Sequence, residues 1–129
     1  MPRRTTPLHF IAPTAVLLAL SGTAWAAGSF DGTYRGTQTV LLNGNYPGCA
    51  ARNVVLTIQN NHFTRLWGGR GDAINVDVAS DGTINATAMY EAGRGRQATV
   101  TITGKIAGPR LEADIGGDRC RLHLSLTKS

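Results

Sequence analysis

The chain has 129 residues, 42% of them hydrophobic and 16% charged, and a formal net charge of +5. Residues 27–129 keep 11 of the 13 basic side chains and all 8 acidic ones, which leaves a net charge of +3. This mild excess argues against a dedicated nucleic-acid binder, which needs a strongly basic face. The length predicts one small domain with a modest core.

Residues 1–26 have the three parts of a secretory signal peptide. Two arginines near the start precede a short apolar stretch, and the small residues Ala24 and Ala26 end it. The stretch is too short for a membrane span, which takes about 20 apolar residues. We therefore expect cleavage between Ala26 and Ala27, no membrane span, and a domain at 27–129 in the periplasm or outside the cell. The alternative is an uncleaved amphipathic anchor.

The two cysteines of the chain, Cys49 and Cys120, both lie within this domain. A single pair in a small exported domain predicts a disulfide, because the compartment is oxidising. Closing a loop of about 70 residues would stabilise the fold by about 4 kcal/mol on the loop-entropy model.

Apolar and polar residues alternate with period 2 through most of the domain, which predicts strands with one aliphatic and one polar face. The amphipathic pattern of a helix is missing from this part of the sequence. About eight strands are expected, at 30–41, 54–59, 62–67, 74–78, 84–90, 100–106, 111–115 and 122–126.

Consecutive antiparallel strands place their connections alternately at two ends. The connections at one end are short, and those at the other end (42–52, 68–73, 91–97 and 116–119) are longer and glycine-rich. Both cysteines fall at this long-loop end, so their disulfide would bring the first and last strands together. The pattern predicts an all-β, monomeric fold: a small antiparallel up-and-down barrel or flattened barrel of about eight strands, closed by one disulfide.

Two hairpins have a predicted register, because facing residues must lie on the same side of the sheet. Val78 should face Ile84 across a turn in which Gly82 has positive φ. Ile115 should face Cys120, which would set Asp114 beside Arg121 and Glu112 beside His123. These acids form a candidate catalytic pair, but cross-strand ion pairs are the favoured interpretation.

Several segments together resemble a set of small exported bacterial β-proteins. They are FDGTYRG (30–36), Cys49, SDGTINA (80–86), ITGKIAG with RLEAD (102–114), and Cys120 with RLHLSL. The resemblance covers nearly all of the domain and implies no function. Short strands with Asp-Gly turns are also similar to avidin-like barrels and small periplasmic inhibitor barrels. The tryptophans of avidins are missing, since Trp67 alone lies in the domain, so biotin-type binding is not implied.

The long-loop end collects positive charge that suits an anion. A guanidinium offers a planar fork of donors to carboxylate, phosphate or sulfate. The alternative is solubilising charge on exposed loops, since three acids lie among these arginines. The arginines in question are Arg52, Arg70, Arg94, Arg96 and Arg119.

Alternation fails at 63–67, where Arg65 shares the inward face with Phe63 and Trp67. An unpaired buried guanidinium is very costly, so Arg65 must be paired, lie near the rim or be bulged outward. A bulge is the favoured interpretation. If Arg65 stacks on Trp67 instead, both side chains join the candidate ligand site.

No catalytic, cofactor or metal motif is found in the sequence. His62 and His123 have no third ligand nearby in the chain, which argues against zinc. We expect a non-catalytic exported binding protein that recognises an anionic small molecule, glycan or envelope component through its arginine- and glycine-rich loop end. The alternative is a periplasmic or secreted inhibitor or protein-interaction module, with a partner protein as its target.

Overall fold

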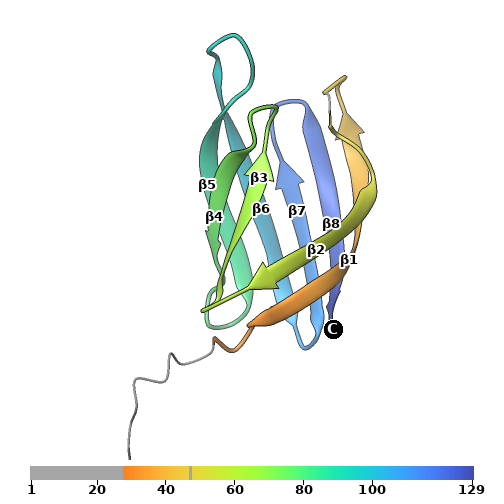
Figure 1. Ribbon diagram of the computed structural model, residues 1–129, viewed down its shortest axis with the longest axis vertical. Coiled ribbons are helices and arrows are strands. Elements are labelled where there is room, and N and C mark those ends of the chain that lie inside the picture. Colours follow the sequence, from red (N-terminus) through yellow and green to blue (C-terminus); the bar gives the residue numbers. More distant parts are fainter. Residues whose placement is uncertain (1–27, 47) are drawn as a thin grey trace, which may run out of the picture.

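The computed structural model describes residues 28–46 and 48–129. The predicted signal peptide and the cleavage site at Ala26 and Ala27 lie outside these residues. The described chain forms eight strands (Figure 1): β1 (Gly32–Asn43), β2 (Arg52–Ile58), β3 (His62–Trp67), β4 (Asp72–Asp77), β5 (Thr83–Glu91), β6 (Gln97–Ala107), β7 (Arg110–Gly116) and β8 (Cys120–Lys128). Within the described ranges, no helix has the length and apolar character needed to cross a membrane.

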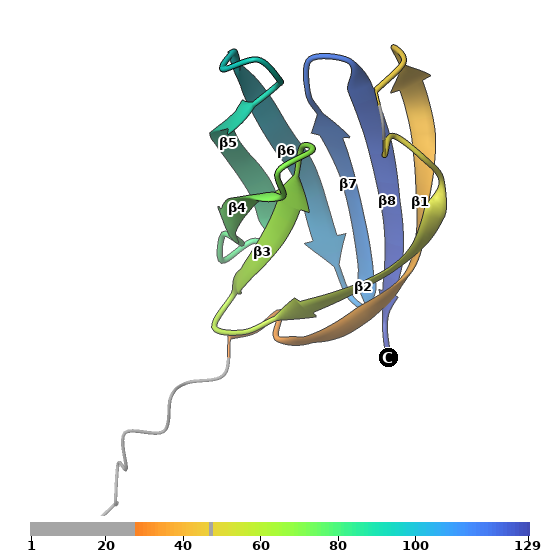
Figure 2. The ribbon, with the colours of Figure 1, turned by 45° about the horizontal axis from the view of Figure 1, so that its top comes forward.

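Six strands form one antiparallel sheet in the order β2-β1-β8-β7-β6-β5, and β3 pairs with β4 in a separate hairpin. Isolated bridges tie this hairpin to its neighbours, Gln59 to His62 on one side and Val78 to Ile84 on the other. The larger sheet curls around an interior that the hairpin covers (Figure 2). Away from their bridge, β2 and β3 diverge toward the long-loop end. The all-β, eight-stranded prediction is confirmed, in the form of a curled half-barrel.

The inward faces match the predicted alternation. Leu56, Ile102, Ile115 and Leu124 are buried, as are the other Val, Ile and Leu residues that share their faces. Val55, the neighbour of Leu56 on β2, points to the opposite face and is 57% exposed. Among the described residues, the one buried polar side chain is that of Gln38 on β1, which is 2% exposed. The core is therefore apolar except near this side chain.

The predicted disulfide is present. Cys49 and Cys120 are bonded, with Cα atoms 5.8 Å apart. Beside the bond, the Gly44 N–H donates to the Arg119 carbonyl oxygen at 2.8 Å. β1 pairs with β8 over nearly its whole length, ending where Asn43 faces Cys120. The first and last strands are thus adjacent, as the cysteine positions predicted.

One predicted register is confirmed and one is wrong. Val78 faces Ile84, and Gly82 has a φ of 89°. In the β7–β8 hairpin, Gly116 faces Arg121, so Asp114 lies opposite His123 and Glu112 opposite Ser125. The Gly117 N–H donates to the Cys120 carbonyl oxygen at 2.9 Å, which closes a tighter turn than the prediction assumed. The pairing is therefore displaced by two residues, and the inward face is unchanged.

Candidate functional site

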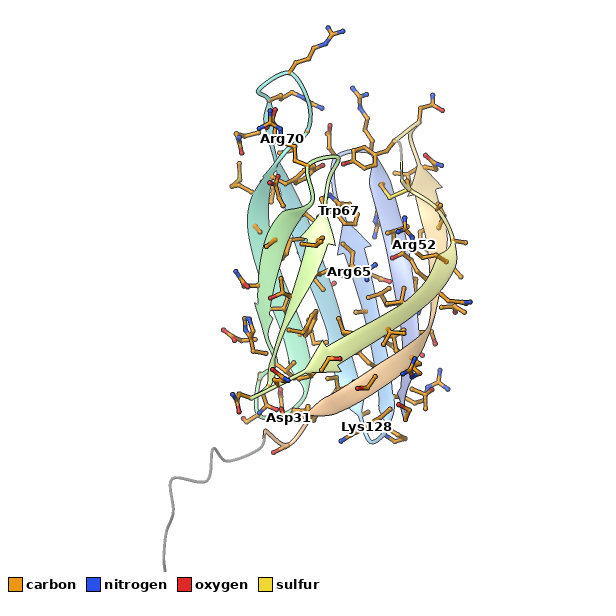
Figure 3. The ribbon with its side chains drawn as sticks, in the orientation of Figure 1. Asp31, Arg52, Arg65, Trp67, Arg70 and Lys128 are labelled. Atoms are coloured by element: carbon orange, nitrogen blue, oxygen red, sulfur yellow. A yellow bond between two sulfur atoms is a disulfide. The ribbon has the colours of Figure 1, made fainter. Side chains whose placement is uncertain are left out.

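A cavity of about 230 Å³ opens at the long-loop end, where β2 and β3 diverge. Figure 3 shows Arg52 on β2 and Arg65 on β3 at this opening, with Trp67 above them. None of the described residues that line the cavity carries a carboxylate. The lining residues are Gln38, Tyr46, Gly48, Arg52, Arg65, Leu66, Trp67, Gly68, Cys120 and Leu122.

Arg65 points inward without a bulge. β3 and β4 pair in regular register from His62 opposite Asp77 to Trp67 opposite Asp72, so the favoured bulge interpretation is wrong. The Arg65 side chain is half-buried, and its Nη2 donates to Oε1 of Gln38. Its Nε is buried and has no hydrogen-bond partner among the described residues. The paired alternative holds, with a neutral amide as the partner.

Gln38 is held in place by the backbone. Its Nε2 donates to the Ala50 carbonyl oxygen at 2.8 Å, while its Oε1 accepts from Arg65. Both ends of the amide are therefore occupied, as a buried polar group requires. Gln38 fixes the Arg65 guanidinium relative to β1 and the loop before β2, so it acts as a positioning residue for the cavity.

The electrostatics of the cavity favour an anion. Burial lowers the pKa of Arg65, and the positive charge of Arg52 lowers it further. Arg52 lies at the mouth, where its Nη2 donates to the Gly48 carbonyl oxygen at 2.8 Å. Within the described part of the chain, neither guanidinium forms an ion pair. Two positive charges thus share one partly dehydrated site.

Trp67 forms an aromatic part of the lining, and its buried Nε1 has no hydrogen-bond partner among the described residues. It is 6% exposed, and its ring meets Tyr90 edge to face with centroids 6.2 Å apart. The Tyr90 hydroxyl accepts from the Asp118 N–H at 2.9 Å. Gly117 lies against the indole, since a Cβ there would come within 2.8 Å of it. The tryptophan is therefore fixed by the β7–β8 turn, and Tyr90 is the aromatic partner in this arrangement.

The other predicted arginines lie apart from this cavity. Arg70 pairs with Glu91 at 2.7 Å, and Arg96 pairs with Asp118 at 2.6 Å. Arg94, Arg96 and Arg119 line a separate surface hollow beside the β5–β6 loop. The structure thus brings Arg52, Arg65 and Trp67 together and divides the remaining arginines between acidic partners and another surface.

Two residues of the cavity, Gln38 and Tyr46, were missed in the sequence. Tyr46 lies in the β1–β2 loop, and its partial burial raises the pKa of its hydroxyl. The sequence pattern around Gln38 could have identified it as a residue of the site. It occupies an inward position two residues after Gly36 and four after Tyr34, so it breaks the apolar face as Arg65 does. Two polar residues at inward positions of different strands predict a partnership, because each needs a buried hydrogen-bond partner.

On the outer face of β7, Asp114 binds His123 instead of the predicted Arg121, and Glu112 binds both His123 and Arg110. His123 lies 2.6 Å from Asp114 and 2.7 Å from Glu112. The hydrogen bond that His123 donates to Asp114 is the main cause of the raised pKa of His123. The hydrogen bond from Arg110 is the main cause that lowers the pKa of Glu112 to about 2. Among the described residues, no His, Cys, Asp and Glu side chains form a group arranged to hold a metal ion.

Comparisons with models of protein families, with curated proteins and with solved structures found no match to this chain. What the site does must therefore be argued from its own chemistry.

Proposed function

We propose that this protein is a non-catalytic exported binding protein, and that the cavity between Arg52 and Arg65 is its site for an anionic ligand. The observation that carries the proposal is the Arg65 guanidinium. It is half-buried, its one side-chain partner is an uncharged amide, and its Nε has no partner among the described residues.

The free-energy cost of burying a charge supports this assignment. A buried charge is expensive unless a counter-charge and hydrogen bonds compensate it. Gln38 supplies a hydrogen bond and no charge. An anion in the cavity would supply the counter-charge and accept from the Arg65 guanidinium, and Arg52 at the mouth would add further donors. Binding of an anion would therefore offset the free-energy cost of burying the Arg65 charge.

Export is supported by two separate features. The pattern of residues 1–26 is that of a signal peptide, and the Cys49–Cys120 disulfide is typical of oxidising compartments. Periplasmic or extracellular residence places the site in contact with nutrients, glycans and envelope components.

Gln38→Glu tests the proposal because it puts an internal carboxylate beside Arg65 with almost no change in shape. The disulfide-bonded protein is titrated by calorimetry at low salt with acetate, phosphate, sulfate, phenylacetate and a heparin oligosaccharide. We expect saturable binding of at least one anion by the unaltered protein, and at least about tenfold weaker binding of it by Gln38→Glu, a change of about 1.4 kcal/mol.

The matched control is Gln59→Glu, which makes the same change in charge at the opposite end of β2, on an exposed side chain. It should bind as the unaltered protein does. Equal affinity in Gln38→Glu and the unaltered protein would reject the cavity as the anion site.

A second candidate, the protein-interaction module, is favoured by one observation. Beyond the bridge between Gln59 and His62, the facing edges of β2 and β3 are unpaired, and Val55 and Leu66 are exposed on these strands. Free strand edges accept an extended segment of a partner. A stoichiometric protein complex would favour this function over the first if Val55→Lys prevents its formation and the anion does not dissociate it.

A further inference from the structure

We infer that the ligand of the Arg52–Arg65 cavity is a small amphipathic carboxylate, with an apolar body about the size of one aromatic ring or a short acyl chain. The inference rests on the proposed function and names the chemical class that the cavity would take.

The lining has two chemical characters. Arg52, Arg65 and Gln38 supply its polar part. The remaining side chains include Trp67, Leu122 and Tyr46, together with the disulfide-bonded Cys120. Inorganic phosphate or sulfate would satisfy the arginines and leave the apolar part in contact with water. An anion with an apolar body would cover both parts and gain the free energy of removing apolar surface from water.

The cavity volume limits the size of that body. A cavity of about 150 Å³ holds a benzene molecule, and drug-sized ligands occupy pockets of about 300–1,000 Å³. The value of about 230 Å³ lies between these sizes. A ring or a short chain carrying one acidic group fits this range, whereas a long-chain fatty acid or an oligosaccharide would extend far outside it.

The donors suit a carboxylate as the acidic group. A guanidinium binds the two oxygens of a carboxylate through parallel N–H···O bonds. Arg65 contacts Gln38 through Nη2 and forms no ion pair among the described residues, so its guanidinium keeps other donors for such a bond. Arg52 similarly commits Nη2 to Gly48 and retains other donors. Both guanidinium groups therefore keep donors for a carboxylate in the cavity.

Calorimetric titration of the disulfide-bonded protein with four probes tests the inference. Phenylacetate combines the acid and the ring, acetate and inorganic phosphate lack the ring, and benzyl alcohol lacks the charge. We expect one phenylacetate per chain, bound at least about tenfold more tightly than acetate or phosphate, a difference of about 1.4 kcal/mol. Benzyl alcohol should bind at least about tenfold more weakly than phenylacetate.

The outcomes separate this inference from the proposed function. If acetate or phosphate binds as tightly as phenylacetate and Gln38→Glu abolishes that binding, the amphipathic class is wrong and the anion site stands. If benzyl alcohol binds as tightly as phenylacetate, the charge has no role and both are wrong. If phenylacetate does not bind, the inference is overturned, whatever the other anions do.

Two variants separate the acidic and apolar parts of the site. Arg65→Met should weaken phenylacetate and acetate alike, whereas Arg35→Met, which removes an exposed charge on the outer face of β1, should leave both unchanged. Tyr46→Ala should weaken phenylacetate by several-fold and leave acetate unchanged. Thermal unfolding of each variant confirms that it is folded. Equal loss of both probes in Tyr46→Ala would contradict an apolar subsite.

Discussion

The Gln38 amide oxygen accepts a hydrogen bond from the Arg65 guanidinium, although their strands, β1 and β3, are not neighbours in either sheet. The contact spans the interior of the half-barrel at the point where β2 and β3 have diverged. It links the larger sheet to the hairpin that covers it. The same contact holds a positive charge inside the opening, so one hydrogen bond serves both the fold and the candidate site.

Replacement of Gln38 by Leu should lower the free energy of unfolding by about 1–3 kcal/mol, because the Arg65 Nη2 and the Ala50 carbonyl oxygen would lose their partners. Urea unfolding measures the change. The control Gln59→Leu alters an exposed side chain and should stay within about 0.5 kcal/mol of the unaltered protein. Equal stability of the two variants would mean that the Gln38–Arg65 bond contributes nothing to the fold.

Reduction of the Cys49–Cys120 bond should destabilise the domain strongly, because the bond closes a segment with a sequence separation of 71. The loop-entropy model gives about 4 kcal/mol for a loop of this size. Urea unfolding of the Cys49→Ser/Cys120→Ser double variant measures this loss. In the unaltered protein, a thiol reagent should label neither cysteine before unfolding. Labelling of both under native conditions would contradict the bond.

Gly36→Ala should destabilise the β1–β8 pair. A Cβ at Gly36 would collide with the Ser125 carbonyl oxygen of the adjacent strand, so the two backbones would have to separate. Overpacking of this kind costs about 1–3 kcal/mol. Gly69→Ala is the matched control, because a Cβ at Gly69 meets nothing within 4 Å. Thermal unfolding should show a lower midpoint for Gly36→Ala, and a midpoint equal to that of Gly69→Ala would refute the close approach.

Stability should decrease as pH rises through the pKa of His123. The Asp114 hydrogen bond raises that pKa above 6.5, so the stabilising contribution is fully present below pH 6.5 and is lost above the raised pKa. Glu112, whose pKa is lowered to about 2, contributes above pH 4.5 and loses this effect only as pH falls toward 2. Measurements between about pH 5 and pH 9, below the range in which tyrosines titrate, therefore isolate the contribution of the histidine.

His123→Gln should remove this pH dependence, and His62→Gln should keep it. The amplitude should stay within about 1 kcal/mol, because His123, Glu112 and Asp114 are 36%, 42% and 47% exposed and solvent screens the pairs. Urea unfolding over a pH series provides the measurement. A pH profile of His123→Gln that overlays that of the unaltered protein would assign the dependence to another group.

The loop arginines should not contribute to carboxylate binding in the cavity. The triple variant Arg70→Ser/Arg94→Ser/Arg96→Ser should keep its affinity for small carboxylates, because Arg70 and Arg96 already pair with Glu91 and Asp118 and none of the three lines the cavity. Its retention on heparin should fall, since a polyanion contacts the exposed loop end and its binding is sensitive to salt. Loss of phenylacetate binding in this variant would show that the binding site lies at the loop arginines and not in the cavity.

The strands and their faces were predictable from the sequence because period-2 alternation reflects the local geometry of an extended chain. Alternation places Val54, Leu56 and Ile58 on one apolar face of their strand, and such a face packs against the interior. Counting strands was then enough to place Cys49 and Cys120 at one end, since each tight turn reverses the direction of the chain. The same strand count predicted that the arginine-containing loops lie at one end of the fold.

Only the tertiary structure decided how these elements close around an interior. The tight β7–β8 turn sets Asp114 opposite His123, and sheet curvature separates β2 from β3 beyond a single bridge. That separation brings Gln38 to Arg65, 27 residues apart, and leaves the guanidinium in an opening. Twist, curvature and loop closure arise from many weak contacts summed over the whole domain, so a local pattern cannot contain them.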